Sequence, residues 1–203
     1  MSIKVLYKTK WVSLRRMILP NKGVNGYDYL HEDRCGGKIV AILPYRYNDS
    51  KDRLEYLLRN EVTPCWSMKQ LVSSITGGVE NDDSIGTAVQ EIAEEAGYKV
   101  KRTDMKFLDV SYGTKSSDTQ YYLYTVDLTG KEKTLDAKGD GSRLEAEAEC
   151  FWSDTIRCCP STRTSFPSTS IIFMSSPLFL NPIEQEILTA CGVCLHTDIP
   201  FPE

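Results

Sequence analysis

One segment constrains the fold of this chain more than any other: a glycine pair followed by an amphipathic run, GGVENDDSIGTAVQEIAEEAGY, residues 77–98. Apolar residues recur in it at steps of four, three and four, at Ile85, Val89, Ile92 and Ala96. This spacing predicts a helix over residues 84–96 with one apolar stripe. Ser84 and the two aspartates before it are typical of a helix start, and Gly97 is typical of a helix end. Gly77-Gly78 predicts a sharp change of direction before the helix.

Three glutamates lie near the end of this helix, Glu91, Glu94 and Glu95, at a spacing that places their carboxylates on one face. Like charges at this spacing cost about a few tenths of a kcal/mol per pair, and the helix dipole disfavours anions at this end. A hard divalent cation is a natural compensator, because magnesium binds one or two carboxylates together with water and substrate phosphate. From the residues alone, a solvated acidic helix face is the commoner explanation of such a run.

The order of the whole segment resembles the signature of the Nudix hydrolase superfamily, G-x5-E-x7-R-E-U-x-E-E-x-G-U, where U is a bulky aliphatic residue. The glycine-led turn and the second half of the signature match at Gly77-Gly78-Val79-Glu80, Glu91, Ile92, Glu94-Glu95 and Gly97. The sequence departs from the signature at three points. Gln90 replaces the arginine, Asp82 or Asp83 replaces the first glutamate, and the stretch from Gly77 to Glu91 is one residue shorter.

The resemblance implies a metal site on this segment. It implies that Glu91 and Glu95 bind Mg²⁺, with Mn²⁺ as an alternative, and that Glu94 assists catalysis. It also implies that the backbone carbonyl of Thr76, just before the glycine pair, adds a ligand.

Strands are predicted on both sides of the helix. They cover residues 3–19 as one or two strands, and residues 27–32, 38–46, 53–62, 105–112, 119–128 and 148–152. Residues 63–76 are predicted to be irregular, and two more helices are expected near residues 168–176 and 182–192. Strands mixed with few helices indicate an α/β or α+β sandwich. The resemblance, which spans about residues 5–180, specifies a Nudix-type α/β/α sandwich with a mixed β-sheet, an N-terminal β-layer (1–35) and a hydrolase domain (36–203).

Outside the signature, the chain resembles the ADP-ribose and nucleoside-diphosphate-sugar pyrophosphatases of the superfamily. DRCGGKIVAILP and LEYLLRNEV resemble their first two core strands, which gives Arg34 and Arg59 as candidates to neutralise a diphosphate; ordinary surface arginines are the alternative. SYGTKSSDTQYYLY resembles their loop that ends in serine-aspartate, which adds Asp118 as a candidate substrate-binding residue. An aromatic side chain could stack on the base, although core packing explains any one aromatic equally well. The candidates for stacking are Trp11, Tyr27 and Tyr29.

The segment RLEAEAECFW resembles the acidic loop and strand that commonly supply the general base in these enzymes. Glu145 and Glu147 are the two candidates, and a solvated loop is the alternative for both. A carboxylate that accepts the proton of the attacking water contributes roughly 10²–10⁴ in rate.

The amino-acid composition disfavours some classes of binding partner. With 24 Lys and Arg against 28 Asp and Glu, the formal net charge is −4, which disfavours binding to long nucleic acid. No apolar run approaches the ~20 residues needed to cross a bilayer, and no signal-peptide pattern opens the chain, so we expect a cytoplasmic protein without a membrane partner. Seven cysteines without scaffold spacing indicate reduced thiols, and Cys191 with Cys194 forms only half of a zinc-site pattern.

The leading expectation is a magnesium-dependent enzyme that hydrolyses ADP-ribose or a related nucleotide sugar to two monophosphates. The resemblance also implies a homodimer that exchanges its N-terminal β-layer. The main alternative is a catalytically weakened module that binds a nucleotide as a sensor or regulator, for which Gln90 and the shortened turn are the reasons. A third, weaker alternative is a hydrolase of RNA caps or dinucleoside polyphosphates.

Overall fold

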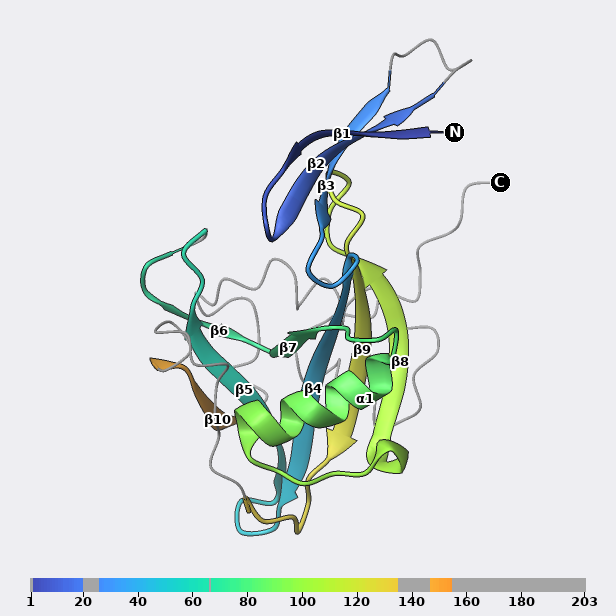
Figure 1. Ribbon diagram of the computed structural model, residues 1–203. Coiled ribbons are helices and arrows are strands. Elements are labelled where there is room, and N and C mark those ends of the chain that lie inside the picture. The colour runs from blue at the N-terminus through green and yellow to red at the C-terminus, as the bar shows by residue number, and fades with distance from the viewer. Residues whose placement is uncertain (1, 20–25, 66, 135–146, 155–203) are drawn as a thin grey trace, which may run out of the picture.

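The computed structural model describes residues 2–19, 26–65, 67–134 and 147–154, which form two separate β-sheets (Figure 1). The smaller sheet is an antiparallel meander of three strands, β1 (Ser2–Lys8), β2 (Val12–Ile18) and β3 (Tyr27–Glu32). The strands predicted over residues 3–19 and 27–32 are therefore confirmed. The boundary expected at residue 35 falls in the turn between β3 and the first strand of the larger sheet.

The larger sheet is mixed, as the sequence resemblance implied. Its main strands follow the order β10-β5-β4-β9-β8, in which β4 and β9 are parallel and the other neighbours are antiparallel. The five strands are β4 (Lys38–Asn48), β5 (Arg53–Val62), β8 (Met105–Tyr112), β9 (Gln120–Asp127) and β10 (Glu149–Asp154). The uninterrupted apolar run at the start of β4 fits its position, because side chains on both faces of the sheet are buried there.

Two short strands were missed by the sequence analysis. The prediction that residues 63–76 are irregular is wrong, because β6 (Gln70–Ser73) pairs with β5, and β7 (Ile75–Gly78) pairs with β4. The prediction of a turn at Gly77-Gly78 is also wrong, because both glycines lie within β7 opposite Val40 and Ile39. Four-residue polar and glycine-containing strands carry little local signal, and their pairing is decided by the long neighbours beside them. The chain reverses later, at Asn81 and Asp82, whose φ angles are +52° and +57°.

The predicted helix over residues 84–96 is present, but its two halves differ. Helix α1 (Ser84–Glu91) is an ordinary α-helix, and Asp83 caps it by accepting the backbone N–H of Gly86 at 3.0 Å. The chain then continues as a wider π-helical turn, η1 (Ile92–Ala96). Gly97 ends this turn with φ +78°, which confirms it as the C-terminal cap. A short 3₁₀-helix, η2 (Arg102–Asp104), leads into β8.

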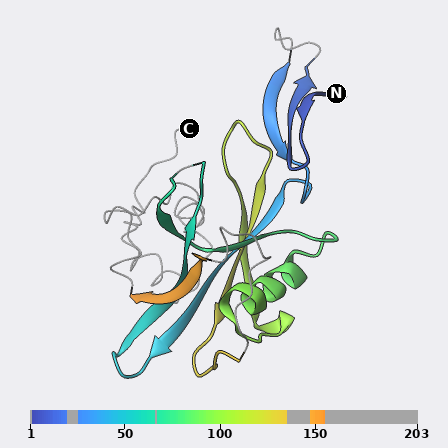
Figure 2. The same ribbon diagram turned by 60° about the vertical axis from the view of Figure 1, so that its left-hand side comes forward.

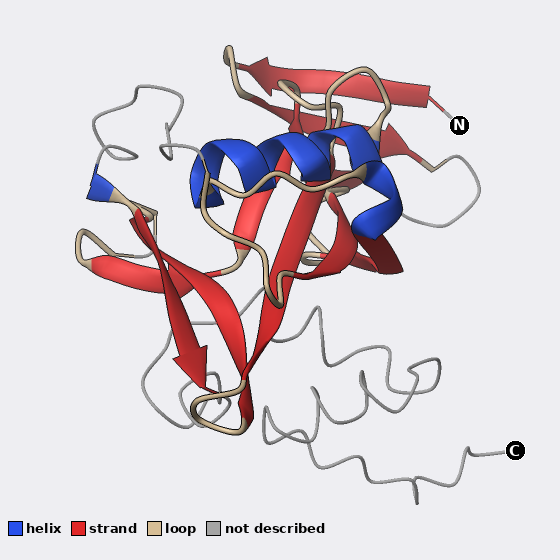
Figure 3. Cartoon of the chain, turned by 90° about the horizontal axis from the view of Figure 1, so that it is seen from below, coloured by secondary structure: helices blue, strands red, loops and turns tan. Residues whose placement is uncertain are grey.

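Helix α1 lies across one face of the larger sheet (Figures 1 and 3). The shared core on this face includes Val40, Ile42, Leu57, Ala88 and Ile92, each almost completely buried. Full burial of one large aliphatic side chain contributes roughly 1.5–3 kcal/mol. On the opposite face Leu43, Tyr56 and Leu58 are buried as well. The helices expected near residues 168–176 and 182–192, which would complete the third layer of the sandwich, lie outside the described residues.

The small sheet stands at one end of the larger sheet and contacts the loop between β8 and β9 (Figure 2). Leu30 donates its N–H to the carbonyl of Ser116 at 2.8 Å, and Asp118 donates its N–H to the carbonyl of Leu30 at 3.2 Å. Tyr27 donates its hydroxyl to the carbonyl of Lys115. These contacts bring β3 of the small sheet next to the loop between β8 and β9 of the larger sheet, and this region is the junction of the two sheets. No helix in the described part of the chain is both long enough and apolar enough to cross a membrane.

Candidate functional site

Glu91, the first predicted metal ligand, lies directly against β7, which contains Gly77 and Gly78 and is called the glycine strand below. A Cβ atom at Gly77 would stand 1.9 Å from Oε1 of Glu91 and 2.2 Å from its Cδ, so the Glu91 carboxylate fills the space of the absent side chain. Thr76 precedes Gly77 in β7, where it pairs with Ala41. The end of α1 and the glycine strand therefore meet at the Glu91 carboxylate.

Glu94 has a different neighbour. Its Oε1 accepts a hydrogen bond from Nε2 of Gln90 at 3.0 Å, and both side chains are exposed. Gln90 stands at the arginine position of the Nudix signature. Its neutral amide therefore contacts the carboxylate one turn further along the same helix and brings no charge to the site.

Glu95 points towards β5, where Arg59 meets it. Arg59 Nη1 lies 3.0 Å from Glu95 Oε2, and Arg59 Nε lies 3.0 Å from Glu61 Oε2. The Arg59 and Glu95 side chains are 4% and 12% exposed, so this ion pair is largely buried. Burial lowers the pKa of Arg59, but the charges of Glu95 and Glu61 outweigh it and hold the pKa above its ordinary value. Ser73 donates its hydroxyl to Glu61 Oε1 at 2.9 Å.

Arg59, which was predicted to neutralise a diphosphate, is buried and pairs with the carboxylates of Glu61 and Glu95. Glu61 and Ser73 were not singled out by the sequence analysis. Strand alternation carries a signal for Glu61, because residues 59 and 61 of one strand face the same side of the sheet. Ser73 gave no such signal, because its strand was not predicted.

The wide turn η1 explains why the three glutamates do not share one set of contacts. Residues three and four apart lie on one face when there are 3.6 residues per turn, and a π-helical turn departs from that spacing. Among the residues that the structure describes, no three His, Cys, Asp or Glu side chains group as a metal site. Glu91 and Glu95 carry oxygen donors of the kind that magnesium binds, and each lies against a different neighbour, Gly77 for Glu91 and Arg59 for Glu95.

The aspartates that replace the first signature glutamate have structural partners. Asp82 accepts a hydrogen bond from Lys38 Nζ at 2.6 Å. Asp83 caps α1 and also accepts two hydrogen bonds from the Arg102 guanidinium, at 2.6 and 2.8 Å. The Arg102 contact is the main reason why the pKa of Asp83 lies at about 2. Both aspartates thus fix the turn that leads into the helix.

The substrate-binding candidates lie around the junction of the two sheets. Arg34 is exposed and lies 3.5 Å from Glu32, and Trp11 is 54% exposed with Lys10 Nζ 4.5 Å from its ring centroid. Tyr29 is buried, which fits core packing rather than stacking on a base. Tyr27 is about half exposed, with its hydroxyl directed to the β8–β9 loop.

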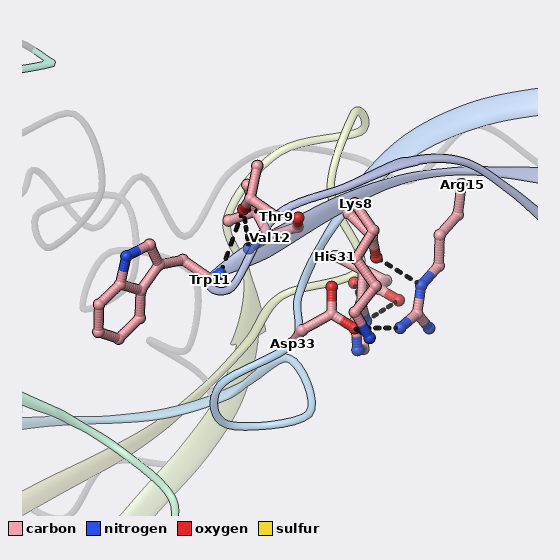
Figure 4. Close-up of polar contacts among 9 residues, drawn as sticks. Lys8, Thr9, Trp11, Val12, Arg15, His31 and Asp33 are labelled. Atoms are coloured by element: carbon pink, nitrogen blue, oxygen red, sulfur yellow. Dashed lines mark hydrogen bonds and ion pairs between the residues drawn. The ribbon is translucent and has the colours of Figure 1, made fainter.

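Asp118 lies against a histidine that the sequence analysis did not select. Oδ2 of Asp118 is 2.8 Å from Nδ1 of His31, whose side chain is 12% exposed. Beside this pair, Asp33 contacts Lys8 and Arg15 at 3.0 Å each, and the Trp11 ring points away from the group (Figure 4). Hydrogen bonding from Ser13 and Lys8 lowers the pKa of Asp33 to about 2.

Of the two candidates for the general base, Glu145 and Glu147, the structure describes Glu147. Glu147 is exposed just before β10, and its carbonyl accepts a hydrogen bond from Gln70 Nε2 at 2.8 Å. This bond ties the start of β10 to β6. Glu145 lies outside the described residues.

Comparison with known proteins bears on the fold. A solved structure described as the crystal structure of ADP compounds hydrolase is 12% identical to this chain, with a TM-score of 0.56. The match covers 95% of this chain and 90% of that chain. The chain has a Nudix-type α/β fold. A MutT/nudix family protein from Enterococcus faecalis matches 58% of this chain and 44% of its own, at 17% identity and a TM-score of 0.45. No protein-family model and no curated protein matches the sequence.

Proposed function

We propose that this chain is a divalent-metal-dependent hydrolase that cleaves the diphosphate bond of ADP-ribose or a related nucleoside diphosphate sugar into two monophosphates. The signature over residues 77–98 supports this, as does the fold shared with an ADP compounds hydrolase. The observation that carries the proposal is the contact of Glu91 with Gly77, because it brings the glycine pair and the acidic helix of the signature pattern together in space.

Glu91, Glu95 and the carbonyl of Thr76 would hold the cation. When bound, a divalent cation neutralises charge on a diphosphate and polarises its phosphorus. Glu94, exposed in η1, is the assisting carboxylate of the proposal. Glu145 or Glu147 would accept the proton of the attacking water, which raises its nucleophilicity as the bond to phosphorus forms.

The remaining candidates would bind the substrate outside the reacting bond. Arg34 carries an exposed guanidinium that can pair with phosphate oxygens in a bidentate fashion. Trp11 presents an exposed indole on which a base can stack. Asp118 has a half-exposed carboxylate that can accept hydrogen bonds from sugar hydroxyls, in addition to its contact with His31.

The test is release of AMP or another monophosphate from a panel of nucleotide sugars, dinucleoside polyphosphates and capped RNA, with and without Mg²⁺. We expect metal-dependent release from ADP-ribose or a nucleotide sugar. Glu91→Gln should lower turnover at least about 100-fold. Glu132→Gln, at an exposed position outside the site, should retain the wild-type rate. Equal rates for Glu91→Gln and wild type would exclude Glu91 from the site.

A second function is favoured by specific contacts. Gln90 brings no charge to Glu94, and Arg59 already engages Glu95, so the site departs from an open acidic cluster. A nucleotide-binding module that senses or regulates would show these features. Saturable binding of ADP-ribose without monophosphate release in the same panel, at any Mg²⁺ or Mn²⁺ concentration, would favour this function over hydrolysis.

We also propose that the chain forms a homodimer through its N-terminal sheet. Every residue of β1 is exposed, including the apolar side chains of Ile3, Val5 and Tyr7, which are 54%, 50% and 66% exposed. A register shift between Val5 and Tyr7 leaves Ile3 and Val5 on one face of this outer strand and Tyr7 on the other. Exposed apolar side chains on an outer strand are a typical interaction surface. A second copy of the same sheet would cover it.

A further inference from the structure

The strongest unassigned feature of the molecule is the polar group buried between β5 and the wide turn η1. At its centre is Arg59, with a side chain 4% exposed and a carboxylate on each side: Glu61 from its own strand and Glu95 from η1. A buried guanidinium is stable only when its charge is matched, and here two carboxylates match it. The Arg59 guanidinium thus joins Glu95 to β5 of the larger sheet.

The backbone of η1 is held at the same place. Cys150 in β10 donates its thiol to the carbonyl of Glu95 at 3.5 Å. The carbonyl of Ile92 accepts the N–H groups of both Gly97 and Tyr98. The side chain and the backbone of Glu95 are therefore fixed by two neighbouring strands.

We propose that Arg59 is a positioning residue, which holds the Glu95 carboxylate in the orientation in which it binds the divalent cation, rather than a residue that contacts the substrate. The inference rests on the proposed function, because it assumes that Glu95 is a metal ligand. No basic residue is present in η1 itself, and Gln90 is neutral. The positive charge that offsets the carboxylates of η1 comes instead from Arg59 in β5.

The physical basis of this role is that side chains which contact a metal ligand, and not the metal itself, set the orientation of that ligand. A carboxylate can pair with a cationic side chain through one oxygen and bind a metal through the other, and the cationic partner sets its orientation. Loss of such a partner typically costs about 10–100-fold in metal affinity or activity. Arginine suits this role because its planar guanidinium contacts two carboxylates in fixed directions, which the flexible ammonium of a lysine does less well.

The experiment measures Mn²⁺ binding to the full chain without substrate, by isothermal titration calorimetry and by the electron paramagnetic resonance signal of free Mn²⁺. We expect Arg59→Met to weaken Mn²⁺ binding about 10–100-fold and Arg59→Lys to weaken it less. In steady-state kinetics at saturating metal, both variants should lower kcat and leave KM within about twofold of wild type. Arg59→Lys keeps the buried charge, so it tests the inference even if Arg59→Met fails to fold.

Arg46→Met is the matched control. Arg46 also pairs with a buried carboxylate, Glu55 at 2.7 Å, on the neighbouring strands β4 and β5 but outside the proposed metal site. The Arg46→Met variant should lose thermal stability, as the Arg59 variants do, and should bind Mn²⁺ with unchanged affinity. A loss of Mn²⁺ affinity in Arg46→Met as large as that in Arg59→Met would reduce the effect to general destabilisation and overturn the positioning role.

Two further outcomes separate the inference from the proposed function. If wild type binds Mn²⁺ and hydrolyses a nucleotide sugar, while the Arg59 variants bind Mn²⁺ normally and show a raised KM, Arg59 contacts substrate and only the positioning role fails. If wild type neither binds Mn²⁺ nor releases a monophosphate, the proposed function fails, and the inference fails with it.

Discussion

The carboxylate of Glu91 occupies the space into which a side chain at Gly77 would project, with Oε1 1.9 Å from the position of the missing Cβ. Gly77 is not among the described glycines with positive φ, so a left-handed backbone is not the reason for glycine here. The reason is room, because the helix carboxylate must approach the backbone of β7. The glycine strand and the acidic helix therefore act as one unit.

Gly77→Ala should displace the Glu91 carboxylate and lower turnover by at least about tenfold, an effect of the size seen when the surroundings of a metal ligand are disturbed. The loss of stability should be small, since the clashing atoms, Oε1, Cδ and Cγ of Glu91, all belong to one flexible side chain that can rotate away. Monophosphate release and Mn²⁺ titration, with thermal unfolding in parallel, measure the two effects.

A double-mutant cycle with Glu91→Ala identifies the cause. If Gly77→Ala acts through the Glu91 carboxylate, it should change the residual rate very little once that carboxylate is absent. Additive losses from the two substitutions would show that Gly77 acts through the strand backbone instead.

The sequence predicted the helix well, because its apolar stripe, its cap residues and Gly97 all indicate the same element. It did not predict β6 and β7, since QLVS and ITGG carry no alternating apolar pattern and pair only because β5 and β4 lie beside them. The error at Gly77-Gly78 has the same origin. Glycine pairs usually mark turns, and here the nearby Glu91 side chain requires glycine within a strand.

The sequence names the residues of the candidate site but does not predict their contacts. The signature named Glu91, Glu94 and Glu95, yet helical spacing alone placed them on one face, and the wide turn η1 directs them to separate partners. Nothing local distinguishes a π-helical turn from an α-helix in EIAEEAG. The pairing of Arg59 with Glu95 joins residues 36 positions apart, and only the packing of η1 against β5 brings them together.

Glu55 predicts how stability falls in acid. Burial raises the pKa of Glu55, but hydrogen bonds from Lys51, Asn48 and Arg46 outweigh it and hold the pKa at about 2, below its ordinary value of 4.5. The pKa is depressed in the folded chain, so the stabilisation is complete above about pH 4.5 and is lost as the pH falls towards 2. At 1.36 kcal/mol per pH unit the shift corresponds to roughly 3 kcal/mol. Glu55→Gln should flatten the decline in urea-unfolding free energy between pH 5 and pH 2, while an unchanged decline would contradict this role.

Asp118 should hold the small sheet against the larger one. Its carboxylate contacts His31, and its N–H donates to the carbonyl of Leu30, so the loop before β9 is bonded to β3 through both side chain and backbone. Asp118→Ala should raise the hydrogen-exchange rates of the amides of β3 and leave those of β4 unchanged. If β3 exchanges at the wild-type rate and only KM for the nucleotide sugar rises, the carboxylate serves the substrate and not the junction.

The exposed strand β1 predicts a dimer that a single charge can disrupt. Val5 is 50% exposed and shares one face of β1 with Ile3, which is 54% exposed, so a second copy that covers this face would bury both. Val5→Lys would place a charge in that contact, which is costly without a partner, and should shift the mass measured by light scattering from dimer to monomer. Met68→Lys, at a position 76% exposed outside the small sheet, should stay dimeric. A wild-type chain that is monomeric at all concentrations, or a Val5→Lys variant that remains dimeric, would show that β1 is not the interface.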